Sequence, residues 1–196
     1  MQDTYDSSIL FLGDSFTEGY LLHPQESFPA ILEKKLLAAG ANYKVINGGR
    51  SGDTAMDALY RTEAFFRNHT NIDFLVLFLG ANDAFQGVDP DFTEKRLREI
   101  IDTARKYRPA IQVFLIRVSS FGLLSPEATG RFDALFERIS AEQDCDLLPF
   151  VLEGIVGNPS LTLGDGVHPN PEGMRLAAER LWTLLFVEGR IPLKDR

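Results

Sequence analysis

Cysteine is nearly absent from the sequence, which contains a single one, Cys145. One cysteine cannot form a disulfide within the chain, and its apolar neighbours predict that it is buried. Long hydrophobic runs are missing as well, since none approaches the roughly 18 residues of a membrane-spanning helix. Residues 1–8 are polar and acidic, unlike a signal peptide. We therefore expect no integral membrane segment and, for the chain as written, a cytoplasmic location. A periplasmic or secreted protein whose signal peptide has been removed would begin in the same way.

Basic residues are outnumbered, with 20 Lys and Arg against 28 Asp and Glu and a net charge of −8. Such a surface repels the phosphates of nucleic acids, so we expect no nucleic-acid partner. Histidine is scarce too, and His23 and His69 have no cysteine or carboxylate at ligand spacing. We therefore predict neither a metal site nor a cofactor. Nothing in the sequence indicates an oligomeric state.

Apolar residues make up 44% of the 196-residue chain, enough for one core, and the length favours a single domain over residues 1–196. Apolar runs predict five strands, at residues 9–12, 43–46, 72–79, 111–118 and 146–148. Between and after them, apolar residues at helical spacing predict helices, at residues 28–39, 54–68, 91–107, 132–139 and 170–186. This alternation predicts an α/β fold, with a parallel sheet covered by helices on both faces. Residues 119–130 are predicted to be a long loop.

Polar residues follow several of these strands at the point where each one ends. Asp14 and Ser15 follow the first strand, a glycine-rich segment at 47–54 follows the second, and Asn82 follows the third. The carboxyl ends of parallel strands form one edge of a sheet, and ligands bind at that edge. Each cluster, taken alone, could equally well close a turn or cap a helix.

A serine hydroxyl needs an adjacent base before it attacks a carbonyl, and His168 is the candidate base for Ser15. Asp165 precedes His168 by three residues, so a short turn can bring its carboxylate to Nδ1 of the imidazole. An ordinary turn with an exposed histidine would produce the same pattern. Acyl transfer also needs donors for an oxyanion, and the candidates are the N–H groups of Ser15 and Gly52 and the side-chain amide of Asn82. Gly52 and Asn82 could instead serve only as turn residues.

Taken together, four segments resemble the conserved blocks of the SGNH (GDSL) hydrolase family. They are Gly13-Asp14-Ser15, Ser51-Gly52-Asp53-Thr54, Gly80-Ala81-Asn82-Asp83 and Asp165-Gly166-Val167-His168-Pro169-Asn170. The resemblance is greatest to the single-domain arylesterase, lysophospholipase and acyl-thioesterase branch. It implies a flavodoxin-like three-layer α/β/α fold with about five parallel strands. It also implies Ser15 as nucleophile, His168 as base, Asp165 as orienting acid, and Gly52 and Asn82 as oxyanion donors. The segment 119–124 departs from that branch, which usually has a more polar sequence there.

The expected activity is hydrolysis of short- to medium-chain esters or thioesters, small-molecule substrates, through an acyl-enzyme on Ser15. Apolar residues near the strand ends are candidates for an acyl-binding groove, namely Phe16, Phe85, Phe121, Leu123 and Leu124. The negative surface favours neutral esters over acyl-coenzyme A. The same site could serve a carbohydrate O-deacetylase.

Two rival hypotheses come from other functional classes. Three carboxylates, Asp14, Asp83 and Asp165, could hold Mg²⁺ in a phosphotransfer enzyme or a receiver module. A non-catalytic binding domain on the same scaffold is the other. The magnesium hypothesis leaves Ser15, His168 and Asn82 without a role.

Overall fold

The computed structural model describes residue 5 and residues 7–193, so most of the polar start discussed above lies outside the described residues. Five strands form one parallel sheet in the order β2-β1-β3-β4-β5. Their bounds are β1 Ser7–Gly13, β2 Tyr43–Gly49, β3 Ile72–Phe78, β4 Gln112–Ile116 and β5 Asp146–Leu148. This strand order is that of flavodoxin-like doubly wound sheets, which confirms the predicted fold class.

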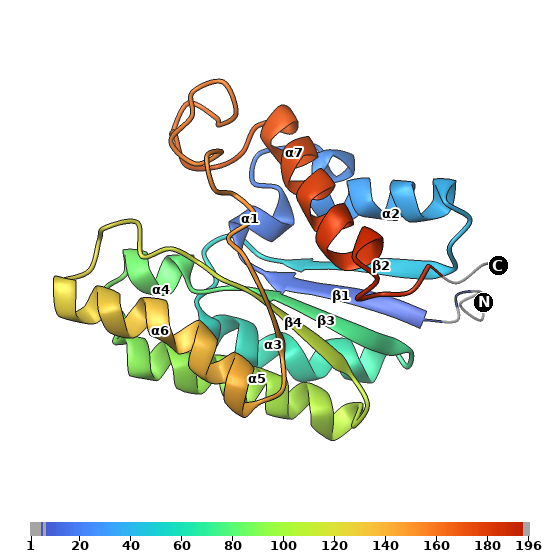
Figure 1. The fold of residues 1–196 in the computed structure, drawn as a ribbon, viewed down its shortest axis with the longest axis horizontal. Helices are drawn as coiled ribbons and strands as arrows, with labels where there is room; N and C mark the ends of the chain where they lie inside the picture. Colours follow the sequence, from blue (N-terminus) through green and yellow to red (C-terminus); the bar gives the residue numbers. More distant parts are fainter. Residues whose placement is uncertain (1–4, 6, 194–196) are drawn as a thin grey trace.

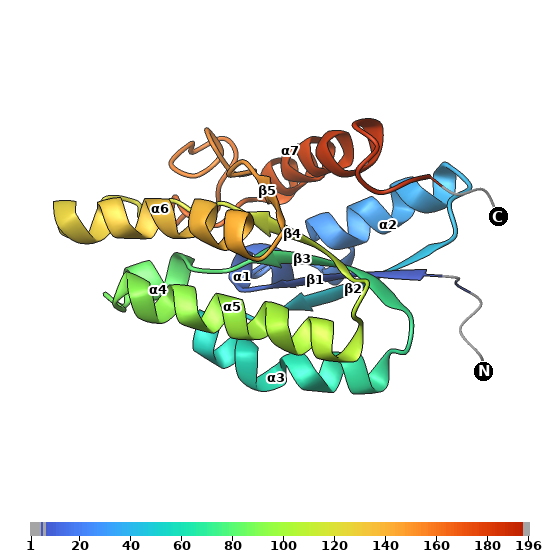
Figure 2. The ribbon, with the colours of Figure 1, turned by 60° about the horizontal axis from the view of Figure 1, so that its bottom comes forward.

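Helices cover both faces of the sheet (Figures 1 and 2). On one face, α2 packs beside α7, and on the other, α5 lies between α3 and α6. Two short helices, α1 and α4, lie at the end of the sheet where the strands finish. The helices are α1 Ser15–Glu18, η1 Pro24–Glu26, α2 Phe28–Ala38, α3 Ala55–Asn68, α4 Ala81–Phe85, α5 Pro90–Tyr107, α6 Pro126–Glu142, α7 Pro171–Trp182 and the π-helical η2 Thr183–Val187.

The core lies on both sides of the central strands. All seven residues of β1 are buried, and so are the last four of β3 and of β4. Strands covered on both faces lose the alternation of apolar and polar residues, which explains their continuous apolar sequences. The largest side chains with almost no exposure come from the strands and from the helices on both faces, and include Phe11, Phe28, Phe78, Phe114 and Phe132. Cys145 is buried, as predicted, and burial raises the pKa of its thiol to about 11.

The segment between β4 and α6 is shorter than predicted. Ser125 accepts a hydrogen bond from the N–H of Ala128 and caps α6, and Pro126 occupies the first helical position. Gly130 therefore lies inside α6, and the expectation of a loop reaching it was wrong. Ser125 followed by Pro126 is a signal for the start of a helix, and it outweighs the tendency of Gly130, four residues after the proline, to mark a loop.

Candidate active site

Ser15 follows β1 at the edge where the strands end. The Asp14 carboxylate accepts a hydrogen bond from the N–H of Phe16 at 2.9 Å, so it caps α1 and makes Ser15 the first residue of that helix. The serine lies on a helical turn, and the residue is only 7% exposed. The first N–H groups of a helix have no partner within the helix, so the N–H of Ser15 is available to a ligand.

Asp165 and His168 come from the segment between β5 and α7. Oδ1 of Asp165 accepts hydrogen bonds from the N–H groups of Val167 at 2.9 Å and His168 at 3.0 Å. Its Oδ2 lies 2.6 Å from Nδ1 of His168, and Nε2 of that ring lies 2.9 Å from Oγ of Ser15. The structure thus brings the three predicted residues into one hydrogen-bonded line, although 153 positions separate Ser15 from His168.

The carboxylate of Asp165 is held in its ionised form. Burial raises its pKa, but the hydrogen bonds from the His168 ring and from the two N–H groups outweigh that effect and lower the pKa to about 2. A carboxylate beside Nδ1 requires the proton to be on that nitrogen, which leaves Nε2 free to accept the proton of the Ser15 hydroxyl. An arrangement of this kind can activate a hydroxyl as a nucleophile.

Gly52, in the loop after β2, and Asn82, in the short helix α4 after β3, lie at the same edge of the sheet. Gly52 has φ +85°, a left-handed conformation that favours glycine, and a side chain added there would have no atom within 4 Å. The side-chain amide of Asn82, in α4, donates a hydrogen bond to the carbonyl oxygen of Asp53 at 2.9 Å. An amide nitrogen carries two N–H groups, so this bond leaves one of them for a ligand.

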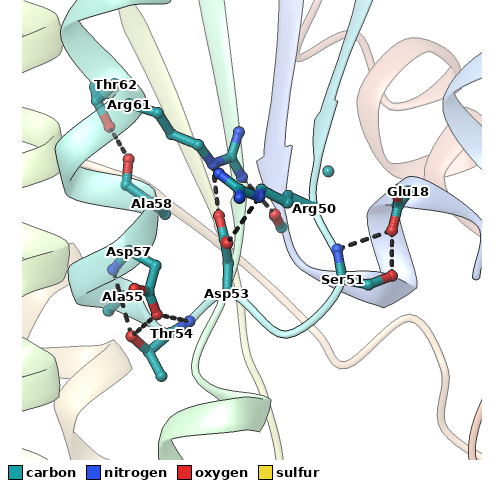
Figure 3. Close-up of polar contacts among 12 residues, drawn as sticks. Glu18, Arg50, Ser51, Asp53, Thr54, Ala55, Asp57, Ala58, Arg61 and Thr62 are labelled. Carbon is teal, nitrogen blue, oxygen red and sulfur yellow. Dashed lines mark hydrogen bonds and ion pairs between the residues drawn. The ribbon is translucent and has the colours of Figure 1, made fainter.

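The segment that contains Gly52 is held by side chains from two sides (Figure 3). On one side the Glu18 carboxylate accepts hydrogen bonds from both the N–H and the hydroxyl of Ser51. On the other side Asp53 pairs with Arg61 at 2.5 Å, and Arg61 also donates to the carbonyl oxygen of Gly13 at 2.9 Å. Sequence reasoning missed these contacts, because Glu18 and Arg61 lie outside the glycine-rich segment and carry no motif of their own.

The carboxylates of the magnesium hypothesis bind other partners. Asp165 pairs with His168, while Asp83 accepts hydrogen bonds from the N–H of Ala55 at 2.9 Å and the hydroxyl of Thr93 at 3.1 Å. Burial raises the pKa of Asp83, and burial also raises that of Asp14, to about 7. Within residues 5 and 7–193, no three side chains of His, Cys, Asp or Glu are grouped so that they could hold a metal ion.

Aromatic side chains lie on two sides of this site. Phe16 is buried, with its ring between Phe78, at a centroid distance of 5.8 Å, and His168, at 5.7 Å. The Tyr20 ring lies 4.3 Å from the His168 ring, a contact that the resemblance did not assign. An aromatic residue five positions after the serine, on the other side of a four-residue helix, was the available signal.

The other candidates for the groove lie further from His168, and Phe150, whose ring is 6.2 Å from that of Phe78, joins their rings to Phe16. The rings of Phe85 and Phe121 stack at 5.7 Å, and Phe121 meets Phe150 edge-on at 5.8 Å. Phe85 and Leu123 are about half exposed, whereas Leu124 is partly buried. Of the five predicted groove residues, Phe85 and Phe121 are therefore in contact, Leu123 and Leu124 follow Phe121 in the same segment, and Phe16 lies beside His168. The sequence did not predict that Phe150 contacts these residues, because a phenylalanine shortly after a short strand carries no recognisable motif.

Among the residues that the structure describes, no helix is long and apolar enough to cross a membrane.

The fold together with a serine, a histidine and an aspartate at this edge defines the class of SGNH hydrolases. Residues 11–176 match the GDSL-like Lipase/Acylhydrolase family, and the chain belongs to that family. It is a hydrolase of the esterase type.

Curated relatives and solved structures agree with this class. The chain is 32% identical to the "Arylesterase" of Vibrio mimicus over 87% of its own length and 84% of that protein. It is 31% identical to "Thioesterase 1/protease 1/lysophospholipase L1" of Escherichia coli K12 over 88% and 80% of the two chains. The crystal structure of TesA aligns with a TM-score of 0.82 at 27% identity, covering 91% of this chain and 98% of that one. The SGNH-hydrolase family esterase AlinE4 aligns with a TM-score of 0.73 at 28% identity, covering 95% and 97%.

Proposed function

We propose that the protein hydrolyses short- to medium-chain carboxylic esters or thioesters through an acyl-enzyme on Ser15. The observation that carries this proposal is the line of hydrogen bonds from Ser15 through His168 to Asp165. The relatives named an arylesterase and a thioesterase support the reaction class, and the family match supports acyl hydrolysis.

In the first half-reaction, Oγ of Ser15 attacks the substrate carbonyl while Nε2 of His168 takes its proton. The imidazolium then forms beside the ionised Asp165, which stabilises its charge. His168 returns the proton to the leaving alcohol or thiol as the bond to the acyl carbon breaks. In the second half-reaction, water attacks the acyl carbon while Nε2 of His168 takes its proton. The bond between the acyl carbon and Oγ then breaks, His168 returns the proton to Oγ, and the acid is released with Ser15 and His168 restored.

The tetrahedral intermediates carry a negative oxygen, and we assign its stabilisation to three donors. These are the N–H groups of Ser15 and Gly52 and the Asn82 amide. Their support is positional: Ser15 begins a helix, Gly52 is unobstructed, and Asn82 is oriented by its bond to the Asp53 carbonyl. Donors held in place before the reaction stabilise the transition state without having to reorganise.

The acyl chain is assigned to the apolar region of Phe85, Phe121, Leu123 and Phe150. Two of these side chains remain about half exposed although they are large and apolar, which favours a role in binding. Each buried CH₂ contributes about 0.8 kcal/mol, so kcat/KM should rise with chain length until the region is filled. Phe16 packs beneath His168 and is left out of this surface.

The first experiment combines a fluorophosphonate with EDTA. We expect one covalent adduct, on Ser15, no adduct in Ser15→Ala, and full esterase activity after chelation. An unlabelled Ser15, or activity abolished by EDTA, would instead support the magnesium hypothesis.

The second experiment measures kcat/KM for nitrophenyl esters from acetyl to dodecanoyl, alongside acyl-coenzyme A, in wild type and Phe121→Ala. Leu37→Ala, an exposed apolar residue of α2, is the matched control. A preference for acetyl that Phe121→Ala leaves unchanged would contradict the acyl surface and favour a carbohydrate O-deacetylase.

A further inference from the structure

Glu18 links the nucleophile's helix to the segment that contains Gly52. Its carboxylate accepts the N–H of Ser51 at 2.8 Å and also the Ser51 hydroxyl. Figure 3 shows these two contacts on the opposite side of the segment from the Asp53 pair with Arg61. Gly52 lies between the two attachments. Nothing lies within 4 Å of the position of a side chain at Gly52, so the neighbouring residues determine where its N–H points.

Helix α1 is a single turn with Ser15 at its first position and Glu18 at its last. The turn is fixed against β2 because Gly49 passes very close to it. A Cβ atom at Gly49 would lie 2.1 Å from the backbone nitrogen of Glu18, a separation that real structures do not show. The Asn47 amide adds a bond to the Glu18 carbonyl oxygen at 3.4 Å. The backbone of Glu18 therefore has one position relative to both Ser15 and the end of β2.

We propose that Glu18 is a positioning residue that orients the Gly52 N–H toward the oxyanion formed at Ser15. This inference rests on the proposed acyl-transfer function. Oxyanion donors act only when they lie about 2.7–3.1 Å from the place where the charge develops. Hydrogen bonds to a carboxylate are shorter and stronger than those between neutral groups, so Glu18 restricts Ser51, and with it the next peptide, more than water would.

The exposure of Glu18 separates this role from a purely structural one. Hydrogen bonds of an exposed side chain contribute little to the free energy of unfolding because water replaces them. Removing Glu18 should thus leave the fold intact and lower the rate of the step in which negative charge forms.

A contact between Glu18 and the substrate is the main competing role. A cavity of ≈ 540 Å³ is lined by Glu18, Tyr20, Asn47 and Ser51, among other residues, and Tyr20 lies against His168. If a leaving group occupied this cavity, loss of Glu18 would act chiefly on KM. The split between kcat and KM therefore distinguishes positioning from substrate binding.

The test compares Glu18→Ala and Glu18→Gln with wild type on one nitrophenyl ester. Active sites are counted by fluorophosphonate labelling, so that kcat refers to folded, competent enzyme. Glu63→Gln is the matched control, since Glu63 is a carboxylate that accepts hydrogen bonds from Tyr107 and Arg67 away from the site. Urea unfolding of each variant monitors the fold.

We expect Glu18→Ala to lower kcat about tenfold. This is less than the loss of about 10²–10³-fold in kcat that follows deletion of an oxyanion donor. KM should change less than about twofold, because the interaction develops in the transition state. Glu18→Gln keeps an acceptor oxygen for Ser51, so its kcat should lie between those of Glu18→Ala and wild type. The kcat of Glu63→Gln should match that of wild type. Ser51→Ala, which loses only the hydroxyl contact, should fall less than Glu18→Ala and provides the test if Glu18→Ala does not fold.

An unchanged or higher kcat in Glu18→Ala, per labelled site, would overturn the proposal. A raised KM at constant kcat would also overturn it and would make Glu18 a substrate contact. Failure of the underlying function looks different, since wild type itself would then be neither labelled at Ser15 nor active on the ester.

Discussion

The buried carboxylate of Asp14 should make the stability of the protein depend on pH. Asp14 is 1% exposed, and it caps α1 by accepting one hydrogen bond from Phe16. Its pKa rises from the ordinary 3.8 to about 7, chiefly through burial, with a smaller contribution from the charges of Asp83 and Asp53. The folded protein therefore binds this proton more tightly than the unfolded chain does.

Asp14→Asn isolates this effect, because asparagine caps helices as well as aspartate and carries no charge. Below pH 3.8 the wild-type carboxyl is neutral in both states, and its contribution is fully present. As the pH rises toward 7, only the unfolded chain loses the proton freely, so the folded state loses stability. At about 1.4 kcal/mol per pH unit, the pKa difference between 3.8 and about 7 corresponds to about 4 kcal/mol.

The assay is urea unfolding of wild type and variant at half-unit steps from pH 5 to 8.5. The free energy of unfolding of Asp14→Asn minus that of wild type should rise by about 1.4 kcal/mol per pH unit up to pH 7 and then level off. Taking the difference cancels the titration of the other groups. Asp133→Asn, on the exposed side of α6, is the control for losing one negative charge. A difference that stays flat across this range, or falls, would refute the reasoning from burial.

Three further predictions concern the site. Asn82→Ala should lower kcat about 10²–10³-fold with little change in KM, measured by steady-state kinetics. A normal kcat would show that the Asn82 amide does not stabilise the oxyanion. Asp165→Asn should lower kcat about 10⁴-fold, because an amide favours the wrong tautomer of His168. The circular dichroism spectrum should stay unchanged. Retained activity would contradict the role of the carboxylate. Arg61→Leu should lower the free energy of unfolding by about 3 kcal/mol, since Asp53, whose side chain is 7% exposed, loses the closer of its two ion-pair partners and keeps only Arg50 at 3.8 Å. A loss below about 1 kcal/mol would mean that Arg50 or water compensates the charge of this carboxylate.

The elements of the sheet could be predicted because their sequences match their environment. The continuous apolar run of β3 reflects burial on both faces, and polar residues after the strands mark the edge of the sheet. The helix α4 escaped prediction because Ala81–Phe85 is a single short turn without a capping side chain. The end of β2 was also missed, because its glycines indicate a loop unless the close approach of α1 to Gly49 is known.

The candidate site was predictable where its residues carry a recognisable motif or act within a short segment. Asp165 and His168 lie three positions apart, so one turn suffices to join them. Glu18 and Ser51 lie 33 positions apart, and their contact depends on how α1 packs against β2. The ring of Tyr20 lies 4.3 Å from that of His168, which comes from the distant segment between β5 and α7. Side chains outside the motifs, such as Glu18 and Tyr20, that are brought to the site by tertiary packing leave no local pattern to identify them.

The distance along the chain between Ser15 and His168 has a consequence for biosynthesis. The ribosome makes β1 and α1 before His168, which lies 153 positions further along the chain and must then reach Ser15. A nascent chain can therefore form most of its sheet and still hold an unactivated hydroxyl. Domains fold as units during synthesis, and here the segment that carries His168, the proposed base, is made after all five strands of the sheet. If Ser15 acts through His168 as proposed, hydrolytic activity is acquired only after the segment of Asp165 and His168 has docked, so a nascent chain that stops before this segment would not hydrolyse esters.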